Sequence, residues 1–225
     1  MDEAIAAEAS ASARAQVAMK EALDTFRHYY RWLATAHGGS LNDQAADAEM
    51  RIRQAVMILT RIDELLAYHR QIEAQIAFNF DLYKIDPDRA ISEFRDRCQG
   101  PTAVALKSFE NSDWLHLLTE QFYWVTFRAR SALRHLPDLG KFDAQGVRNM
   151  RNKLIEHPEG RDSLIFNAGF GFGGPRGPIL AASRTDQQSN RWPDAGLFPN
   201  AEEFATNLVM CIGASAAGPP TNVLA

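Results

Sequence analysis

Residues 43–80 read DQAADAEMRIRQAVMILTRIDELLAYHRQIEAQIAFNF and contain neither glycine nor proline. Apolar residues recur in this stretch at spacings of three and four, the period that returns side chains to one face of an α-helix. They are Ile52, Val56, Leu59, Ile62, Leu65 and Leu66, and Ile72 and Ile76 continue the stripe. Helices of this length are typical of helical bundles and helical dimer interfaces. The stretch therefore predicts a mainly α-helical fold.

Similar helical patterns flank this stretch on both sides. On the N-terminal side, a helix is expected from near the start of the chain to about Ala36, where Gly38-Gly39 ends it. On the C-terminal side, Asp86-Pro87 interrupts the pattern. Two more helices are expected beyond it. The first, over residues 113–136, is rich in aromatics that mostly belong to the core, and the second covers residues 143–156.

The pattern changes in the last third of the chain. Residues 163–172 alternate between apolar and other residues, a glycine- and proline-rich turn follows, and residues 179–182 can return as a second strand. This predicts a small β-hairpin, followed by a final helix over residues 201–215. We therefore expect a helical bundle with long helices over residues 1–160. The hairpin and C-terminal helix, residues 161–225, are expected to pack on the same domain.

The composition limits the classes of protein. The chain has 225 residues, 46% hydrophobic and 23% charged, which is ordinary for a globular protein with one sizeable core. Cys98 and Cys211 match no metal-binding spacing and indicate a reducing compartment. Charged residues interrupt the first stretch, so no secretory signal is expected, and the apolar run 208–212 is too short to cross a bilayer. These features predict a cytoplasmic protein without a membrane partner.

Charge is distributed unevenly along the chain. The net charge is −4, but residues 128–161 contain eight basic and four acidic residues and carry +4, which leaves −8 for the remainder. A locally basic surface on an acidic protein indicates a phosphate-handling site. The alternative is that these charges belong to solvated helix faces.

The basic segment contains a compact arrangement of polar residues. Residues 147–157 read VRNMRNKLIEH. Val147, Met150 and Leu154 share the expected buried face, so Arg151 and Asn152 are expected at its edge. His157 precedes Pro158, and the helix is expected to end there.

An arginine, a polar residue directly after it and a histidine after five intervening residues resemble the signature of the HEPN family. HEPN domains are α-helical and usually dimeric, and many are metal-independent endoribonucleases. The resemblance implies that Arg151 binds and stabilises phosphate, Asn152 orients it, and His157 acts as general acid or base. Arg148 and Lys153 become candidates for contacts with the RNA backbone. It also implies RNA as a partner, a homodimer, no cofactor and no metal. An antitoxin or regulatory protein would be a further partner of a toxin or defence effector.

The chemistry of these residue types agrees with RNA cleavage. A histidine with a pKa near neutrality can accept the proton of a 2′-hydroxyl group or protonate the leaving 5′-oxygen. An arginine can hold the scissile phosphate with two hydrogen bonds and offset the charge that grows in the transition state. RNA supplies the nucleophile, so no metal is required and DNA should not be cut.

The spacing of arginine and histidine is not specific by itself. The family signature allows four to six intervening residues, and Arg31 with His37 (five) and Arg130 with His135 (four) also satisfy it, but neither arginine is followed by asparagine. Two alternatives stay open. The chain can be a non-catalytic module that binds RNA, a nucleotide or a protein, because Glu159 stands where several HEPN toxins have tyrosine. The motif can also be purely structural, with His157 at the helix end and Arg151 paired with a nearby glutamate.

Overall fold

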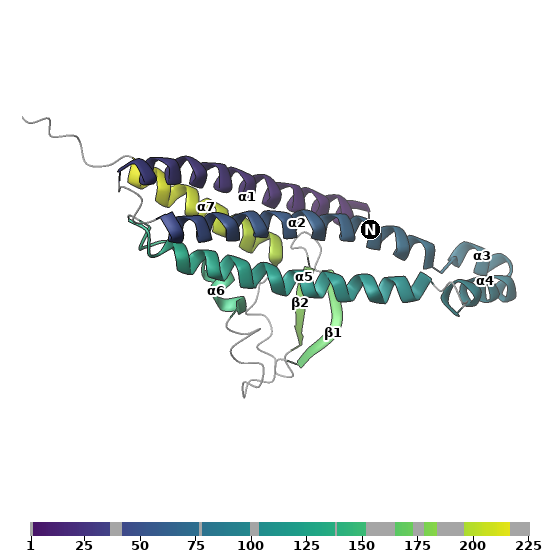
Figure 1. The fold of residues 1–225 in the computed structure, drawn as a ribbon. Coiled ribbons are helices and arrows are strands. Elements are labelled where there is room, and N and C mark those ends of the chain that lie inside the picture. Colours follow the sequence, from purple (N-terminus) through teal and green to yellow (C-terminus); the bar gives the residue numbers. More distant parts are fainter. Residues whose placement is uncertain are drawn as a thin grey trace, which may run out of the picture. The chain divides into compact units, whose positions relative to one another are not determined.

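The chain is mainly helical in the computed structural model, as the sequence predicts (Figure 1). The structure describes residues 2–36, 42–76, 78–99, 104–137, 139–151, 165–172, 178–183 and 196–216. The helices are α1 (Asp2–Ala36), α2 (Asn42–Ile76), α3 (Phe80–Ile85), α4 (Pro87–Gln99), α5 (Val104–Leu133), α6 (Gln145–Arg151) and α7 (Leu197–Ala216). The strands are β1 (Ile165–Phe172) and β2 (Pro178–Ser183). None of the helices within these ranges is both long and apolar enough to span a membrane.

Contacts divide the chain into two compact units, residues 1–59 with 119–225 and residues 60–118. In the first unit, α7 packs along α1, at opposite ends of the sequence (Figure 1). Small buried side chains, among them Ala15 and Ala22 on α1 and Ala205 on α7, let the two helix backbones approach closely. Larger aromatics fill the rest of this core, including Phe122, Phe142 and Phe204, and the rings of the last two meet edge to face at 5.2 Å.

The second unit shows where the helix boundaries differ from the predictions. The long second helix ends at Ile76 and not at Phe80, because the Asn79 side chain accepts a hydrogen bond from the Leu82 amide at 2.9 Å and caps α3 instead. Residues 87–99, for which no helix was predicted, form α4. Asp86 caps this helix through the Arg89 amide, and Pro87 suits its first position.

The aromatic-rich helix α5 begins at Val104, nine residues before the predicted start at Asp113. Phe122 and Tyr123 are buried as expected, whereas Trp114 is exposed. Trp124 is half-buried under the guanidinium of Arg128, which lies 5.7 Å from its ring. The polar Asn111 is buried in the second unit and donates to the Leu65 carbonyl at 3.1 Å, so the buried amide group is partnered.

β1 and β2 pair antiparallel, with Phe166 opposite Ala182 and Gly171 opposite Ile179. The register shifts between Phe166 and Phe170. The residues that would form the glycine-rich turn, 173–177, lie outside the described part of the chain, so the complete hairpin stays a prediction.

Candidate functional site

The segment between α5 and α6 folds over a small apolar core. Leu136, Leu139 and Phe142 are buried, and backbone bonds join the Leu139 amide to the Leu136 carbonyl and the Phe142 amide to the Leu139 carbonyl. The Tyr29 hydroxyl of α1 donates to the Pro137 carbonyl at 2.6 Å. These contacts hold the start of α6, the helix to which Arg151 belongs.

Asp143 joins α5 to α6 through its carboxylate. Its Oδ1 lies 2.7 Å from Nε of Arg130, whose side chain is only 8% exposed, and its Oδ2 lies 3.5 Å from Nη1 of Arg148. The Ala144 amide also donates to Oδ1 at 3.0 Å. Burial raises the pKa of Asp143, but the hydrogen bond and charge of Arg130, assisted by the charge of Arg148, outweigh it and the pKa is lowered. The carboxylate is therefore ionised, and the positive charges of Arg130 and Arg148 balance its negative charge.

Glu203 of α7 occupies the N-terminal end of α6. Its Oε1 accepts from the Gln145 amide at 2.9 Å and its Oε2 from the Gly146 amide at 3.0 Å, so two amides that lack helical partners are satisfied by one carboxylate. Asn207 adds a bond from its Nδ2 to the Asp143 carbonyl at 2.9 Å. α6 is thus attached to α7 at its beginning.

Gly146 permits this close approach. A Cβ atom at this position would collide with the Asn200 side chain and would lie 2.7 Å from Oε2 of Glu203. Asn200 cannot move aside freely, because it is buried and its Nδ2 donates to the Tyr123 hydroxyl at 2.9 Å. Burial raises the pKa of Tyr123, which outweighs the opposite effect of this hydrogen bond, so the hydroxyl stays protonated. Sequence reasoning missed Glu203, Asn200 and Asn207, because their partners are 57 or more residues away along the chain.

Of the predicted site residues on this segment, Arg151 is the last residue of α6 that the structure describes. The side chain of Arg151 lies outside the described part of the structure, as do Asn152, Lys153 and His157. Whether Arg151 and His157 come together is therefore still a prediction. Val147 and Met150 are buried, as the predicted face requires.

Arg148 lies one helical turn before Arg151. Its Nη2 donates to Oε1 of Gln145 at 2.6 Å, and its guanidinium faces Asp143. The side chain stays partly exposed, with donors that are not used by these two contacts. A phosphate near the end of α6 could bind to it.

The structure argues against one rival arginine–histidine pair. Arg130 is buried in its ion pair with Asp143, so its guanidinium is not available to a phosphate, whereas His135 is exposed. The other rival, Arg31 with His37, is not tested, because His37 lies outside the described residues.

Exposed cations surround the loop that leads into α6. Arg134 donates from Nε to the Gly140 carbonyl at 3.3 Å, and Lys141 follows directly in the chain. We call these two residues of the α5–α6 segment, together with Arg148 of α6, the basic surface. No group of three or more histidine, cysteine, aspartate or glutamate side chains in the described ranges could hold a metal ion.

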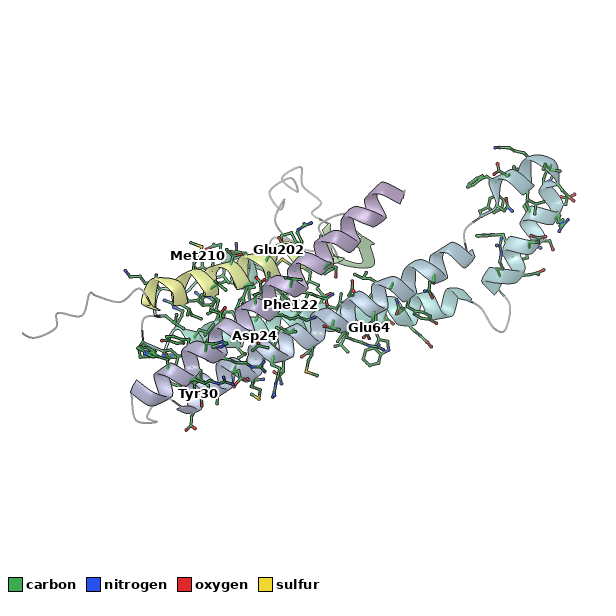
Figure 2. The ribbon with its side chains drawn as sticks, turned by 90° about the horizontal axis from the view of Figure 1, so that it is seen from above. Asp24, Tyr30, Glu64, Phe122, Glu202 and Met210 are labelled. Carbon is green, nitrogen blue, oxygen red and sulfur yellow. The ribbon has the colours of Figure 1, made fainter. Side chains whose placement is uncertain are left out.

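A separate shallow cavity of about 180 Å³ lies between α1 and α7. Its lining residues include one carboxylate and no cation: Ala18, Glu21, Ala205, Thr206, Val209 and Met210, the last of which Figure 2 labels on α7. This composition does not suit an anionic ligand.

Comparisons with protein-family models, curated proteins and solved structures found no match for the chain.

Proposed function

We propose that this chain is a metal-independent endoribonuclease of the HEPN type. The observation that carries the proposal is the attachment of α6, the helix to which Arg151 belongs. Asp143, just before α6, accepts a hydrogen bond from Arg130 of α5, and Glu203 of α7 accepts hydrogen bonds from two backbone amides at the start of α6. A catalytic arginine needs a rigid support, because small displacements of a group that stabilises a transition state cost much of its effect.

The charges around α6 also favour RNA binding. Glu203 uses one oxygen on each of two amides, and Asp143 faces two arginines, so neither carboxylate offers an uncompensated charge to a phosphate. Arg134, Lys141 and Arg148 supply positive charge beside the helix. Phosphate contacts of this kind supply affinity and positioning without requiring a sequence preference.

In the proposed reaction, His157 takes the proton of a 2′-hydroxyl group or gives one to the leaving 5′-oxygen. Arg151 holds the scissile phosphate and stabilises its transition state, and Asn152 orients it. The 2′-oxygen forms a bond to phosphorus as the bond to the 5′-oxygen breaks, which leaves a 2′,3′-cyclic phosphate. Two copies would bring their motifs together in a cytoplasmic homodimer, and an antitoxin or regulatory protein would hold such a toxin or defence effector inactive.

Cleavage of single-stranded RNA in the presence of EDTA tests this proposal. Wild type should cut RNA and leave cyclic phosphate ends, while Arg151→Ala and His157→Ala should lose about a hundredfold or more of the rate. His135→Ala is the matched control, since it removes an exposed histidine of the rival pair and should change nothing. RNA binding without turnover would instead favour the non-catalytic module.

A further inference from the structure

A tryptophan near the C-terminal end of α1 is exposed and yet held in place from below. Trp32 is 54% exposed, and its ring centroid lies 5.8 Å from that of Tyr29, with 33° between the two ring planes. Aromatic rings at this separation stabilise each other. Tyr29 is buried, and its hydroxyl donates to the Pro137 carbonyl at 2.6 Å. The indole of Trp32 is therefore supported by a fixed ring, while more than half of its surface faces solvent.

The same contacts connect Trp32 to the loop that carries the basic surface. Pro137 lies between Arg134 and Lys141, and the Arg134 side chain donates back to this loop at 3.3 Å. The C-terminal ends of α1 and α5 accordingly lie at one end of the first unit (Figure 1). Two contacts, Trp32 with Tyr29 and Tyr29 with Pro137, thus bring an exposed indole and exposed cations to the same end of that unit.

The charges of both segments that meet there are positive. Asp24 is paired with Arg27, and between Asp24 and Asp43 the chain has two arginines and no acidic residue. Residues 128–142 contain four basic residues and one acidic residue. A local field of this sign attracts a polyanion, although the whole chain is acidic.

Trp114 of α5 shows that exposure of an indole is not enough. It is 58% exposed, slightly more than Trp32, and it belongs to the second unit. Residues 104–118 contain one basic and two acidic residues, and both acidic side chains, Glu110 and Asp113, are exposed. This part of α5 offers an aromatic ring without a positive field, so Trp114 is a matched control for Trp32.

An exposed aromatic ring beside cations suits single-stranded nucleic acid. The cations contact the phosphates, and an unpaired base stacks on the ring. We infer that Trp32 stacks on an unpaired base of an RNA strand whose phosphates contact the basic surface. The inference rests on the proposed function for the identity of the ligand, and it adds a base-binding residue outside the motif of Arg151 and His157. Because every base has an aromatic face, this subsite would favour unpaired strands without requiring a particular sequence.

Fluorescence anisotropy with two oligomers of equal length tests the inference. One is a 2′-O-methyl oligouridylate, which cannot be cleaved, and the other has the same backbone with abasic residues. Trp32→Ala should raise the dissociation constant of the oligouridylate about tenfold and change that of the abasic oligomer by less than about twofold. Trp114→Ala should change neither dissociation constant.

Two further variants separate stacking from packing on Tyr29. Trp32→Leu keeps an apolar side chain beside Tyr29 but has no aromatic face, so it should weaken binding of the oligouridylate as Trp32→Ala does. Trp32→Phe keeps a ring and should retain most of the affinity. Circular dichroism checks that each variant is folded, and Trp32→Leu carries the test if Trp32→Ala does not fold.

The inference is overturned if Trp32→Leu binds the oligouridylate as tightly as wild type, or if it loses equal affinity for both oligomers. A wild type that binds neither oligomer also overturns it. Cleavage of single-stranded RNA in EDTA reports on the proposed function separately. Cleavage by a wild type whose affinity does not depend on Trp32 would reject the base site alone, whereas base-dependent binding through Trp32 without cleavage would reject the ribonuclease alone.

Discussion

Arg130 illustrates how one residue can be essential to a fold without being available for chemistry. Its guanidinium is nearly buried and lies 2.7 Å from the Asp143 carboxylate, which is 41% exposed. Removing one partner of such a pair leaves the other charge buried without compensation. The folded state then loses more stability than the intact pair contributes to it. The partial exposure of Asp143 reduces that cost, because solvent screens the charge.

Asp143→Asn should therefore lower the free energy of unfolding by about 2 kcal/mol at neutral pH, measured by urea denaturation. Asp81→Asn is the matched control. Asp81 pairs with Lys84 at 3.0 Å, but the Asp81 side chain is 92% exposed. Asp81→Asn should therefore lower the free energy of unfolding by less than about 0.5 kcal/mol. Equal effects of the two variants would show that burial of Arg130 does not matter.

The same carboxylate predicts a pH dependence. Arg130 and Arg148 hold the pKa of Asp143 below its ordinary value of about 3.9. A lowered pKa in the folded state gives stability that is present above the unfolded pKa and is lost as the pH falls through the folded one. The difference between wild type and Asp143→Asn should thus be full at neutral pH and shrink below about pH 4. A difference that is constant down to pH 2 would contradict this assignment.

At the scale of helices, α6 depends on α7 for its position. Gly146→Ala places a methyl group against Asn200 and Glu203, which hold the beginning of α6, so it should cost about 1–3 kcal/mol in the free energy of unfolding. Gly213→Ala is the control within α7, since among the described residues the added Cβ would meet nothing within 4 Å apart from its chain neighbours and the backbone of its own helix. It should stabilise the protein by about 0.5–1 kcal/mol, because glycine is a poor helix former. Thermal unfolding of both variants measures these changes. If both substitutions stabilised the protein, the close packing of α6 against α7 would be contradicted.

The helices also show what the sequence could and could not predict. Apolar stripes predicted α1 and most of α2, since burial of one face follows directly from periodicity. α4 was missed because it is short and strongly charged, and the capping of its first turn by Asp86 marks where it begins. At the site, the buried face of α6 could be predicted from Val147 and Met150. The attachment through Glu203 and Asn207 could not, because tertiary contacts alone bring those residues to α6.

At the scale of the whole molecule, the net charge of −4 opposes RNA binding, so a local field has to overcome it. Arg134 donates to the carbonyl of Gly140, the residue before Lys141, and both Arg134 and Lys141 are exposed. Each phosphate contact releases counterions, which makes binding weaken with salt, with a slope of about 0.7 per contact for a single strand.

Lys141→Ala should therefore weaken binding of a 2′-O-methyl RNA, which cannot be cleaved, and lower the salt slope by about 0.7. Lys84→Ala is the control, because Lys84 is also exposed but belongs to the other unit, where it pairs with Asp81, so both affinity and slope should stay unchanged. Fluorescence anisotropy at several salt concentrations measures both quantities. Equal slopes for wild type and Lys141→Ala would mean that RNA does not pass over the basic surface, and that the positive segment compensates the protein's own acidic charge instead.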